Sequence, residues 1–332
     1  MSQPHGLRAT IARAIVSEGD NPSLAAGLMV TALALLSFQD AIIKLTSDWL
    51  SIWQFQTVRS LINISLLLAT AALVAGWRQL VPRHIGAVIL RSAFLVGAML
   101  CFFSGVPFLS LAEIAAGLYL FPLIVALLSR FVLGETVGPD RLAAVAAGFI
   151  GSMLILKPAT DDFQMVSLLP VVAAFFYACM VLTTRKLCRG ESPLALASGV
   201  AIAFLSVGLI GLAIFPAPSE ASAQNLQWSY LMTGWHPLSL VLFAAIATCS
   251  LLNLVANILL ARAYQTAESS WLAPYDYSYL VFAAVWGYVL WGTIPDPLTL
   301  CGMALIAGAG IFVATRGAAP ADQPAPTPPT GR

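Results

Sequence analysis

Long apolar stretches separated by short polar breaks run along almost the whole chain. A helix needs roughly 20 apolar residues to cross the hydrocarbon core of a bilayer. Ten stretches approach this length, at 24–46, 52–76, 86–106, 110–133, 140–157, 165–187, 193–215, 237–262, 268–292 and 297–316. The pattern predicts an all-α integral membrane protein with ten transmembrane helices, and it leaves little chain for a soluble catalytic domain.

Two parts of the chain resemble each other. One begins at an Ala-Glu pair with Glu113 and the other at a pair with Glu268. Each continues through a proline-bearing span, with Pro122 or Pro274, into a final span rich in glycine and alanine. Five spans per half is an odd number, so the halves have opposite orientation, an arrangement typical of secondary transporters. The predicted domains are a tail over 1–22, repeats over 23–160 and 161–316, and a disordered tail over 317–332.

Composition and charge support a membrane location. Hydrophobic residues make up 59% of the chain and charged residues 9%, whereas a soluble domain carries about 25% charged residues. The net charge of +1 argues against nucleic acid as a partner, which needs a concentrated basic surface. Lysine and arginine collect in alternate loops, and the long loop at 216–236 has none. Because positive residues favour the cytoplasmic side, both termini are predicted to be cytoplasmic.

Nothing in the chain indicates a metal, a cofactor or an enzyme. The five cysteines lie scattered without CxxC spacing, and the three histidines fall in tails and loops. A metal centre needs clustered ligands, and ATP hydrolysis needs a phosphate-binding loop that is not visible here. A channel usually repeats a selectivity loop or a ring of like charges. An intramembrane enzyme and a channel are therefore the less favoured alternatives.

Charged residues in the first two spans need a partner or a purpose, since a charge near the bilayer centre costs at least ~2.5–3.5 kcal/mol. Asp40 and Lys44 are four residues apart and can pair on one helix face. Alternatively, Asp40 lies on the transport path as a cation contact or a proton carrier, with Gln39 beside it. Arg59 can pair with Asp40, or its planar fork can bind a carboxylate or phosphate-like group of a substrate. These alternatives stay open.

Aromatic and acidic residues gather around Pro274 in the ninth span. Proline removes a helical hydrogen bond, which is tolerated inside a membrane only beside protein or a water-filled cavity. Spacing of four residues places three aromatic rings on one stripe, and aromatic faces suit flat heterocycles and cations. The alternative is an interfacial aromatic belt, above all for the first ring. The residues of this cluster are Trp271, Tyr275, Asp276, Tyr277 and Tyr279.

Three further polar positions complete the candidate site. Asn253 and Asn257 are four residues apart on the eighth span, where amides bridge helices or contact a ligand. Tyr119, close to Pro122 in the fourth span, is the repeat counterpart of the Tyr275 region.

Several of these features occur together in one known family. They are the segment from Asp40 to Lys44, Arg59, the LGET sequence at 133–136 ahead of Gly148 and Gly151, and the APYDY sequence at 273–277. In this order they resemble the drug/metabolite transporter superfamily, in its ten-helix EamA-type branch. The run from 90 to 160 and the APYDY segment are similar to bacterial members assigned to S-adenosylmethionine or riboflavin uptake. Many relatives have a glutamate where this chain has Thr293, which puts a symmetric role for Glu135 in doubt.

The resemblance implies a secondary transporter that moves a small heterocyclic or cationic metabolite, such as riboflavin or S-adenosylmethionine, across a bacterial inner membrane by alternating access. An amino-acid or drug exporter of the same family is the alternative. The expected partners are this substrate and the lipid bilayer, and Asp40 and Asp276 are the candidates for proton coupling. Direction of transport, coupling and assembly as a homodimer stay open. The predicted substrate-binding residues are Gln39, Asp40, Arg59, Tyr119, Asn253, Asn257, Trp271, Tyr275, Asp276 and Tyr279.

Overall fold

The structure, a computed structural model, describes residues 22–134, 138–157, 164–218, 225–266 and 269–316. Almost all of the two predicted tails lies outside these ranges, as do Glu135 and Glu268. The described residues form helices and no strand.

All ten predicted spans are helical, which confirms the fold class. Among the described residues, seven helical segments are long and apolar enough to cross a membrane, and Leu142–Leu156 and Pro297–Val313 are shorter apolar segments. The fourth and ninth spans are each broken into two helices, an interruption that the apolar pattern did not predict. The spans are α2 (Pro22–Thr46), α3 (Ile52–Thr70), α4 (Ile85–Gly105), α5 (Leu111–Leu118) with α6 (Phe121–Val132), α7 (Pro139–Leu156), α8 (Leu169–Leu187), α9 (Pro193–Ile214), α12 (Leu240–Thr266), α13 (Ser269–Asp276) with α14 (Ser278–Trp291), and α15 (Pro297–Arg316).

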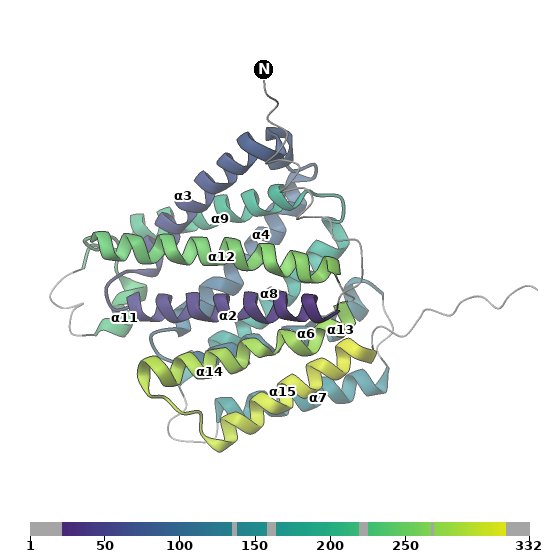
Figure 1. Cartoon of the computed structure of the whole chain (residues 1–332). Helices are drawn as coiled ribbons and strands as arrows, with labels where there is room; N and C mark the ends of the chain where they lie inside the picture. The colour runs from purple at the N-terminus through teal and green to yellow at the C-terminus, as the bar shows by residue number, and fades with distance from the viewer. Residues whose placement is uncertain (1–21, 135–137, 158–163, 219–224, 267–268, 317–332) are drawn as a thin grey trace, which may run out of the picture.

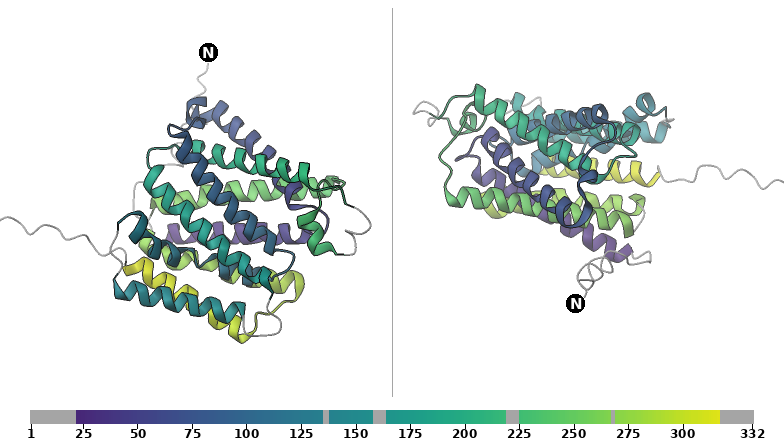
Figure 2. Two further views of the ribbon diagram at one scale, coloured as in Figure 1. Left: turned by 180° about the vertical axis from the view of Figure 1, so that it is seen from behind. Right: turned by 90° about the horizontal axis from the view of Figure 1, so that it is seen from above.

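The helices form two layers (Figures 1 and 2). Helices α12, α2, α14 and α15 lie side by side in one layer, and α9, α4, α8, α6 and α7 lie behind them. Helix α3 packs on α9 at one edge, and α15 packs on α7 at the other. Helix α2 therefore lies in the middle of its layer, between α12 and α14.

Glycines allow the close helix contacts at both edges. A Cβ on Gly302 of α15 would lie 2.5 Å from the carbonyl oxygen of Gly151 on α7. At the other edge, a Cβ on Gly211 of α9 would lie 2.1 Å from the ring of Trp53 on α3. Small residues let the backbones of two helices approach closely, and the van der Waals contact between them is a main source of helix association in lipid.

The two broken spans share the same backbone geometry. Tyr119 ends α5 with φ −70° and ψ 6°, and Tyr277 precedes α14 with φ −72° and ψ −5°. Positive φ values follow at Gly134 (74°) and Gly292 (65°). Each member of these pairs lies 158 positions from its counterpart (277 − 119 and 292 − 134). This register matches Tyr119 with Tyr277, rather than Pro122 with Pro274 as the sequence suggested. The domain boundary near 160 stays a prediction.

The long loop at 216–236 contains a short helix, α11 (Leu226–Met232), that the sequence analysis left out. The segment after α11 is joined to the start of α3. Ser51 Oγ donates to the Gly234 carbonyl oxygen at 2.6 Å, and Gln54 exchanges two hydrogen bonds of 2.9 Å with the backbone of His236. These bonds fix α11 beside α3, where Tyr230 reaches the interior.

Candidate substrate site

Asp40 is the central carboxylate of the site, on the middle helix α2. It is 8% exposed. The Tyr279 hydroxyl on α14 donates to its Oδ2, and the Gln39 amide donates to its Oδ1 at 3.2 Å. Asp40 is therefore held from its own helix and from the second broken span.

Lys44 does not pair with Asp40. Its ammonium group donates to the carbonyl oxygens of Val106, at 2.9 Å, and Leu109. These carbonyls follow the end of α4, where the last carbonyl groups of a helix lack intrahelical donors. The proposed pairing of Asp40 with Lys44 along one helix face is wrong, because Lys44 satisfies another helix end.

Arg59 on α3 approaches Asp40 through Gln39. Its Nη2 donates to Gln39 Oε1 at 3.4 Å, and its guanidinium lies over the rings of Phe55 at 5.8 Å and Phe103 at 6.0 Å. The direct ion pair between Arg59 and Asp40, one of the open alternatives, is not formed. Ion pairs within the described part of the chain join Lys157 to Asp296 and His84 to Glu191.

Three tyrosines bring the two broken spans together beside Asp40. The rings of Tyr119 and Tyr279 stack with centroids 5.3 Å apart and an angle of 18° between their planes. The rings of Tyr119 and Tyr277 lie 5.4 Å apart at 59°. We call Tyr119, Tyr277 and Tyr279 the aromatic cluster. One of its rings comes from the first broken span and two come from the second.

Asp276, the second carboxylate of the predicted site, is the last residue of α13. It is within electrostatic range of the hydroxyls of Tyr119 and Tyr277. Asp276 also interacts electrostatically with Tyr177 of α8. The rings of Tyr177 and Phe121 pack edge-on, with their centroids 4.7 Å apart. Tyr279 thus joins the aromatic cluster to Asp40 by a hydrogen bond, and Tyr277 of the cluster directly follows Asp276 in the chain.

The remaining predicted residues are less closely joined to this site. Tyr275 is half-buried and packs against the core that contains the cluster. The side chain of Trp271 lies outside the described structure. Asn257 is exposed and donates to the carbonyl and side-chain oxygens of Asn253 at 2.7 and 3.2 Å. The side-chain hydrogen bonds described for these two asparagines stay within α12.

Sequence reasoning left several neighbours out of the site. Tyr277 lies in the ninth span, but it is not one of the aromatic rings spaced four residues apart. Only the 158-residue register, which matches it with Tyr119, indicates that it belongs to the site. Tyr177, Tyr230 and Cys249 come from other helices and carry no local signal. Cys249 lies close to Gln39, whose carbonyl oxygen is 3.8 Å from its Sγ.

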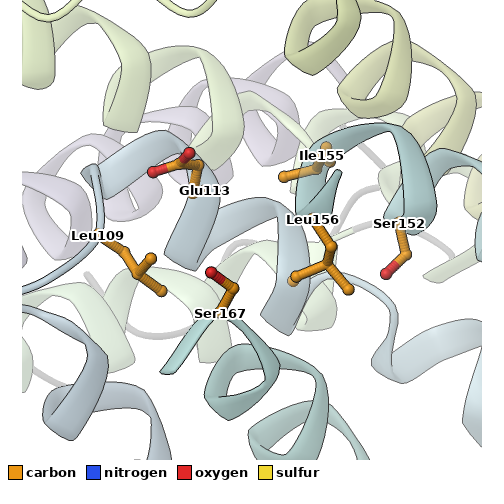
Figure 3. A pocket seen from close by; sticks show the side chains of 7 residues that line it. Leu109, Glu113, Ser152, Ile155, Leu156 and Ser167 are labelled. Atoms are coloured by element: carbon orange, nitrogen blue, oxygen red, sulfur yellow. The ribbon is translucent and has the colours of Figure 1, made fainter. Parts of the chain in front are cut away.

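Two cavities lie away from this site, near one end of the bundle. The larger, of about 140 Å³, lies among α5, α14 and the start of α15, and Glu113, Gly287 and Asp296 are among the residues that line it. The smaller, of about 10 Å³, includes Glu113, Ser152 and Ser167 in its lining (Figure 3). Neither cavity is lined by a predicted substrate-binding residue.

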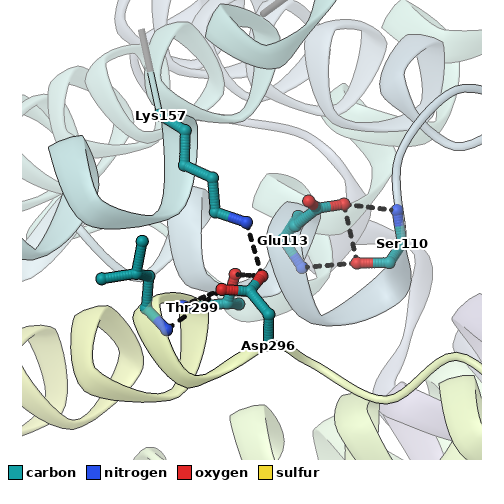
Figure 4. Close-up of polar contacts among 6 residues, drawn as sticks. Ser110, Glu113, Lys157, Asp296 and Thr299 are labelled. Carbon is teal, nitrogen blue, oxygen red and sulfur yellow. Dashed lines mark hydrogen bonds and ion pairs between the residues drawn. The ribbon is translucent and has the colours of Figure 1, made fainter. Parts of the chain in front are cut away.

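The charged groups at this end cap helices (Figure 4). Glu113 closes a capping box with Ser110 at the start of α5. Asp296 accepts from Lys157 Nζ at 2.5 Å and from Thr299 Oγ1 at 2.7 Å, and it caps α15. The hydrogen bond from Lys157 holds the pKa of the Asp296 carboxyl well below its usual range.

Comparison with known proteins shows which family and which proteins this chain resembles. Residues 23–157 match the EamA-like transporter family. A riboflavin transporter of Vibrio cholerae is 31% identical over 192 residues, which is 58% of each chain. A pseudopaline exporter of Pseudomonas aeruginosa is 26% identical over 288 residues, 85% of this chain and 94% of that protein. An S-adenosylmethionine uptake transporter of Rickettsia felis is 26% identical over 227 residues, 68% of this chain and 70% of that protein. Residues 23–157 therefore resemble the EamA-like transporter family, and the aligned relatives are named as transporters or exporters.

The fold over both halves of the chain is shared with a protein of known structure. A protein of known crystal structure superposes on 90% of this chain and 99% of its own, with a TM-score of 0.59 at 19% identity. The alignment with the Vibrio riboflavin transporter spans 58% of that protein. The family resemblance predicted from the order of the motifs is confirmed, and the family and its named members are membrane transporters rather than enzymes.

Proposed function

We propose that this EamA-like protein is a secondary transporter that carries a small heterocyclic or cationic organic metabolite across the bacterial inner membrane by alternating access. One observation supports this most strongly. The aromatic cluster lies where the two broken spans meet, with Tyr279 hydrogen-bonded to Asp40 and Tyr277 directly following Asp276 in the chain. The names of two relatives, a riboflavin transporter and an S-adenosylmethionine uptake transporter, fit a ligand of this class.

The chemistry of the cluster suits such a ligand. Ring faces stack on flat heterocycles and attract cations, and a buried carboxylate stabilises a positive charge that enters beside it. Broken helices inside a membrane lie where substrates bind in many transporters, because irregular backbone is tolerated there only beside protein or a cavity. Movement of α5–α6 relative to α13–α14 would separate Tyr119 from Tyr277 and open the site to one side.

Export is the second candidate. The pseudopaline exporter aligns with 85% of this chain, a larger share than the riboflavin transporter. A site between two halves serves either direction, since the imposed gradients determine which way substrate moves. The same residues would then bind an amino-acid-derived metabolite on its way out.

Counterflow in proteoliposomes tests the proposed function. Riboflavin, S-adenosylmethionine and aromatic amino acids form the substrate panel. We expect unlabelled substrate inside to accelerate entry of at least one labelled panel member. Asp40→Asn should reduce this exchange roughly tenfold or more, as expected when bonds to a charged group are weakened. Asp48→Asn, the same change at an exposed residue after α2, is the matched control.

Three results would contradict the proposed function. Flux without exchange acceleration indicates a channel. A chemically altered product indicates an enzyme. Failure of every panel member to exchange removes the proposed substrate class.

We further propose Asp40 and Asp276 as the groups that couple transport to protons. If they do, substrate entry by the native protein acidifies vesicles loaded with a pH-sensitive dye, and Asp40→Asn or Asp276→Asn abolishes that signal. Substrate accumulation by both variants with the native pH dependence would exclude this coupling role.

A further inference from the structure

Arg59 is a buried cation that is poorly satisfied by the protein. Its single described side-chain hydrogen bond, to Gln39 at 3.4 Å, is long for an N–H···O bond. Its Nε atom is buried, and the described residues offer it no acceptor. Phe55 and Phe103 cover the guanidinium, but ring faces provide no oxygen in the plane of its N–H groups. Leaving a buried charge in this state is costly.

Two more polar groups without described partners lie near Arg59. The Nε2 atom of Gln56 and the hydroxyl of Tyr230 are buried, and both residues are 2% exposed. Gln56 precedes Arg59 by three residues, so the two share a face of α3. Tyr230 of α11 is within electrostatic range of Arg59. All three groups can donate hydrogen bonds, so this region has an excess of donors over acceptors.

The nearest carboxylate does not supply the missing acceptor. Asp40 already accepts from Tyr279 and from Gln39. Gln39 lies between the two charges, because its oxygen accepts from Arg59 while its amide donates to Asp40. An oxygen anion beside Arg59 would complete this network from outside the chain.

We propose that Arg59, Gln56 and Tyr230 bind the carboxylate or phosphate group of the transported substrate. The proposal rests on the proposed function and narrows its substrate class. A planar guanidinium matches the two oxygens of such a group, and a lysine does not. With the anion at Arg59, the heterocyclic or cationic part of the same molecule reaches Asp40 and the aromatic cluster. The substrate therefore carries an anionic group as well as a ring or a cation.

Matched pairs of probes test this recognition on the purified full-length protein. The pairs are phenylalanine with phenethylamine, riboflavin 5′-phosphate with riboflavin, and S-adenosylmethionine with its decarboxylated form. In at least one pair, the native protein should bind the anionic member roughly tenfold more tightly, as expected for a hydrogen-bonded charge. Arg59→Gln should abolish that preference, and Arg59→Lys should restore only part of it. Arg78→Gln, at an exposed position, is the control.

The outcomes separate this proposal from the proposed function. If the panel shows counterflow while both members of each pair bind equally, or if Arg59→Gln keeps the preference, anion recognition is overturned and the transporter stands. If no probe binds and none is transported, both are overturned. Stabilisation by phosphatidylglycerol alone, lost in Arg59→Gln, would assign the site to lipid and overturn its role in substrate binding.

A second variant covers the case in which Arg59→Gln does not fold. Tyr230→Phe removes one hydroxyl and keeps the ring in its apolar contacts with Phe55 and Phe103. It should reduce the preference for the anionic probe while leaving the thermal midpoint without probe unchanged. An unchanged preference in Tyr230→Phe would contradict the proposed donor set.

Discussion

Tyr279 contributes two separable interactions to the site. Its hydroxyl donates to Asp40, and its ring stacks on Tyr119. Tyr279→Phe removes the first and keeps the second. We expect substrate affinity to fall roughly tenfold, because hydrogen bonds to charged groups contribute about 1.5–3 kcal/mol. Tyr288→Phe, at a 59% exposed position on the same helix, should leave affinity unchanged in equilibrium binding. Equal affinities of the Tyr279→Phe and native proteins would show that this hydroxyl does not support binding.

Asp296 gives the fold a predictable response to acid. The bond from Lys157 lowers its folded-state pKa below the ordinary value of 3.8. The stability that this carboxylate contributes is therefore complete above the ordinary value of 3.8 and is lost as the pH falls through the folded-state pKa. Asp296→Asn should lower the thermal midpoint in detergent at pH 7. The difference from native should shrink below pH about 4, because this carboxylate then takes up protons in the unfolded state before it does so in the folded state.

The size of that effect is limited by solvent. The Asp296 side chain is 42% exposed, so screening keeps its ion pair at about 1 kcal/mol or less. Asp48→Asn, also exposed and acidic, is the control and should show no such pH-dependent gap. A gap that stays constant from pH 7 to pH 3 would contradict the assigned role.

Residue types in the site could be predicted from sequence, but their partners could not. Asp40 and Arg59 stood out because charged groups are costly inside lipid, Tyr279 because of the spacing of the aromatic rings, and Tyr119 as the repeat counterpart of the Tyr275 region. Their contacts depend on other helices. Lys44, placed for a bond to Asp40 on its own helix, instead donates to carbonyls 62 and 65 positions away.

At the level of helices, apolar length predicted the spans and missed their breaks. The segment Leu111–Val132 keeps a mean hydropathy of 2.2 across its break, since Tyr119 and Leu120 are themselves apolar or weakly polar. Pro122 was a usable signal, because it lies in the first turn of α6, where proline is favoured. Pro274 was less informative, since it lies inside α13 and the break follows at Tyr277.

The contact between α7 and α15 depends more on Gly302 than on Gly308, which lies in the same helix. A Cβ at Gly302 meets the Gly151 carbonyl oxygen at 2.5 Å and Ile155 at 2.6 Å, whereas a Cβ at Gly308 meets nothing within 4 Å. Gly302→Ala should destabilise the protein by about 1–3 kcal/mol through overpacking. Gly308→Ala should be neutral or slightly stabilising, because alanine favours a helix over glycine.

Thermal unfolding of the two alanine variants in one detergent measures this difference. Both substitutions add one methyl group to the same helix, so intrinsic helix propensity cancels between them. Equal midpoints would mean that the edge formed by α7 and α15 relaxes freely, and that its glycines do not determine the packing distance.

Across the whole molecule, the two halves meet at Tyr119 and Tyr277. The register of 158 residues places one tyrosine in each broken span, and the fold brings their rings within 5.4 Å. Sequence similarity suggested a repeat but matched the wrong positions, because short apolar strings align in several registers. Backbone geometry at the breaks and at Gly134 and Gly292 fixes the register.

The ends of the bundle also differ in charge, and this difference determines the expected orientation. The loop before α4 and the loop before α9 are joined at one end. Glu191 accepts from the backbone N–H groups of Arg83, at 2.8 Å, and His84, at 2.6 Å. Arg78 and Arg83 lie before α4, and Arg185, Lys186 and Arg189 lie at the end of α8 and in the loop before α9, whereas the loop that contains α11 has no arginine or lysine. Positive loops stay on the cytoplasmic side, so the end with Glu191 should face the cytoplasm.

Reporter fusions test this orientation and the number of crossings together. A fluorescent protein fused after Arg332 should fluoresce, because it folds in the cytoplasm, and alkaline phosphatase at that position should be inactive. Phosphatase inserted after Gly234, beyond α11, should be active because seven crossings separate it from a cytoplasmic N-terminus. Phosphatase activity at both positions would mean that an even number of crossings follows Gly234 in place of the expected three. The mirrored arrangement of five crossings per half would then be lost. Alternating access through a site shared by the two halves depends on that arrangement.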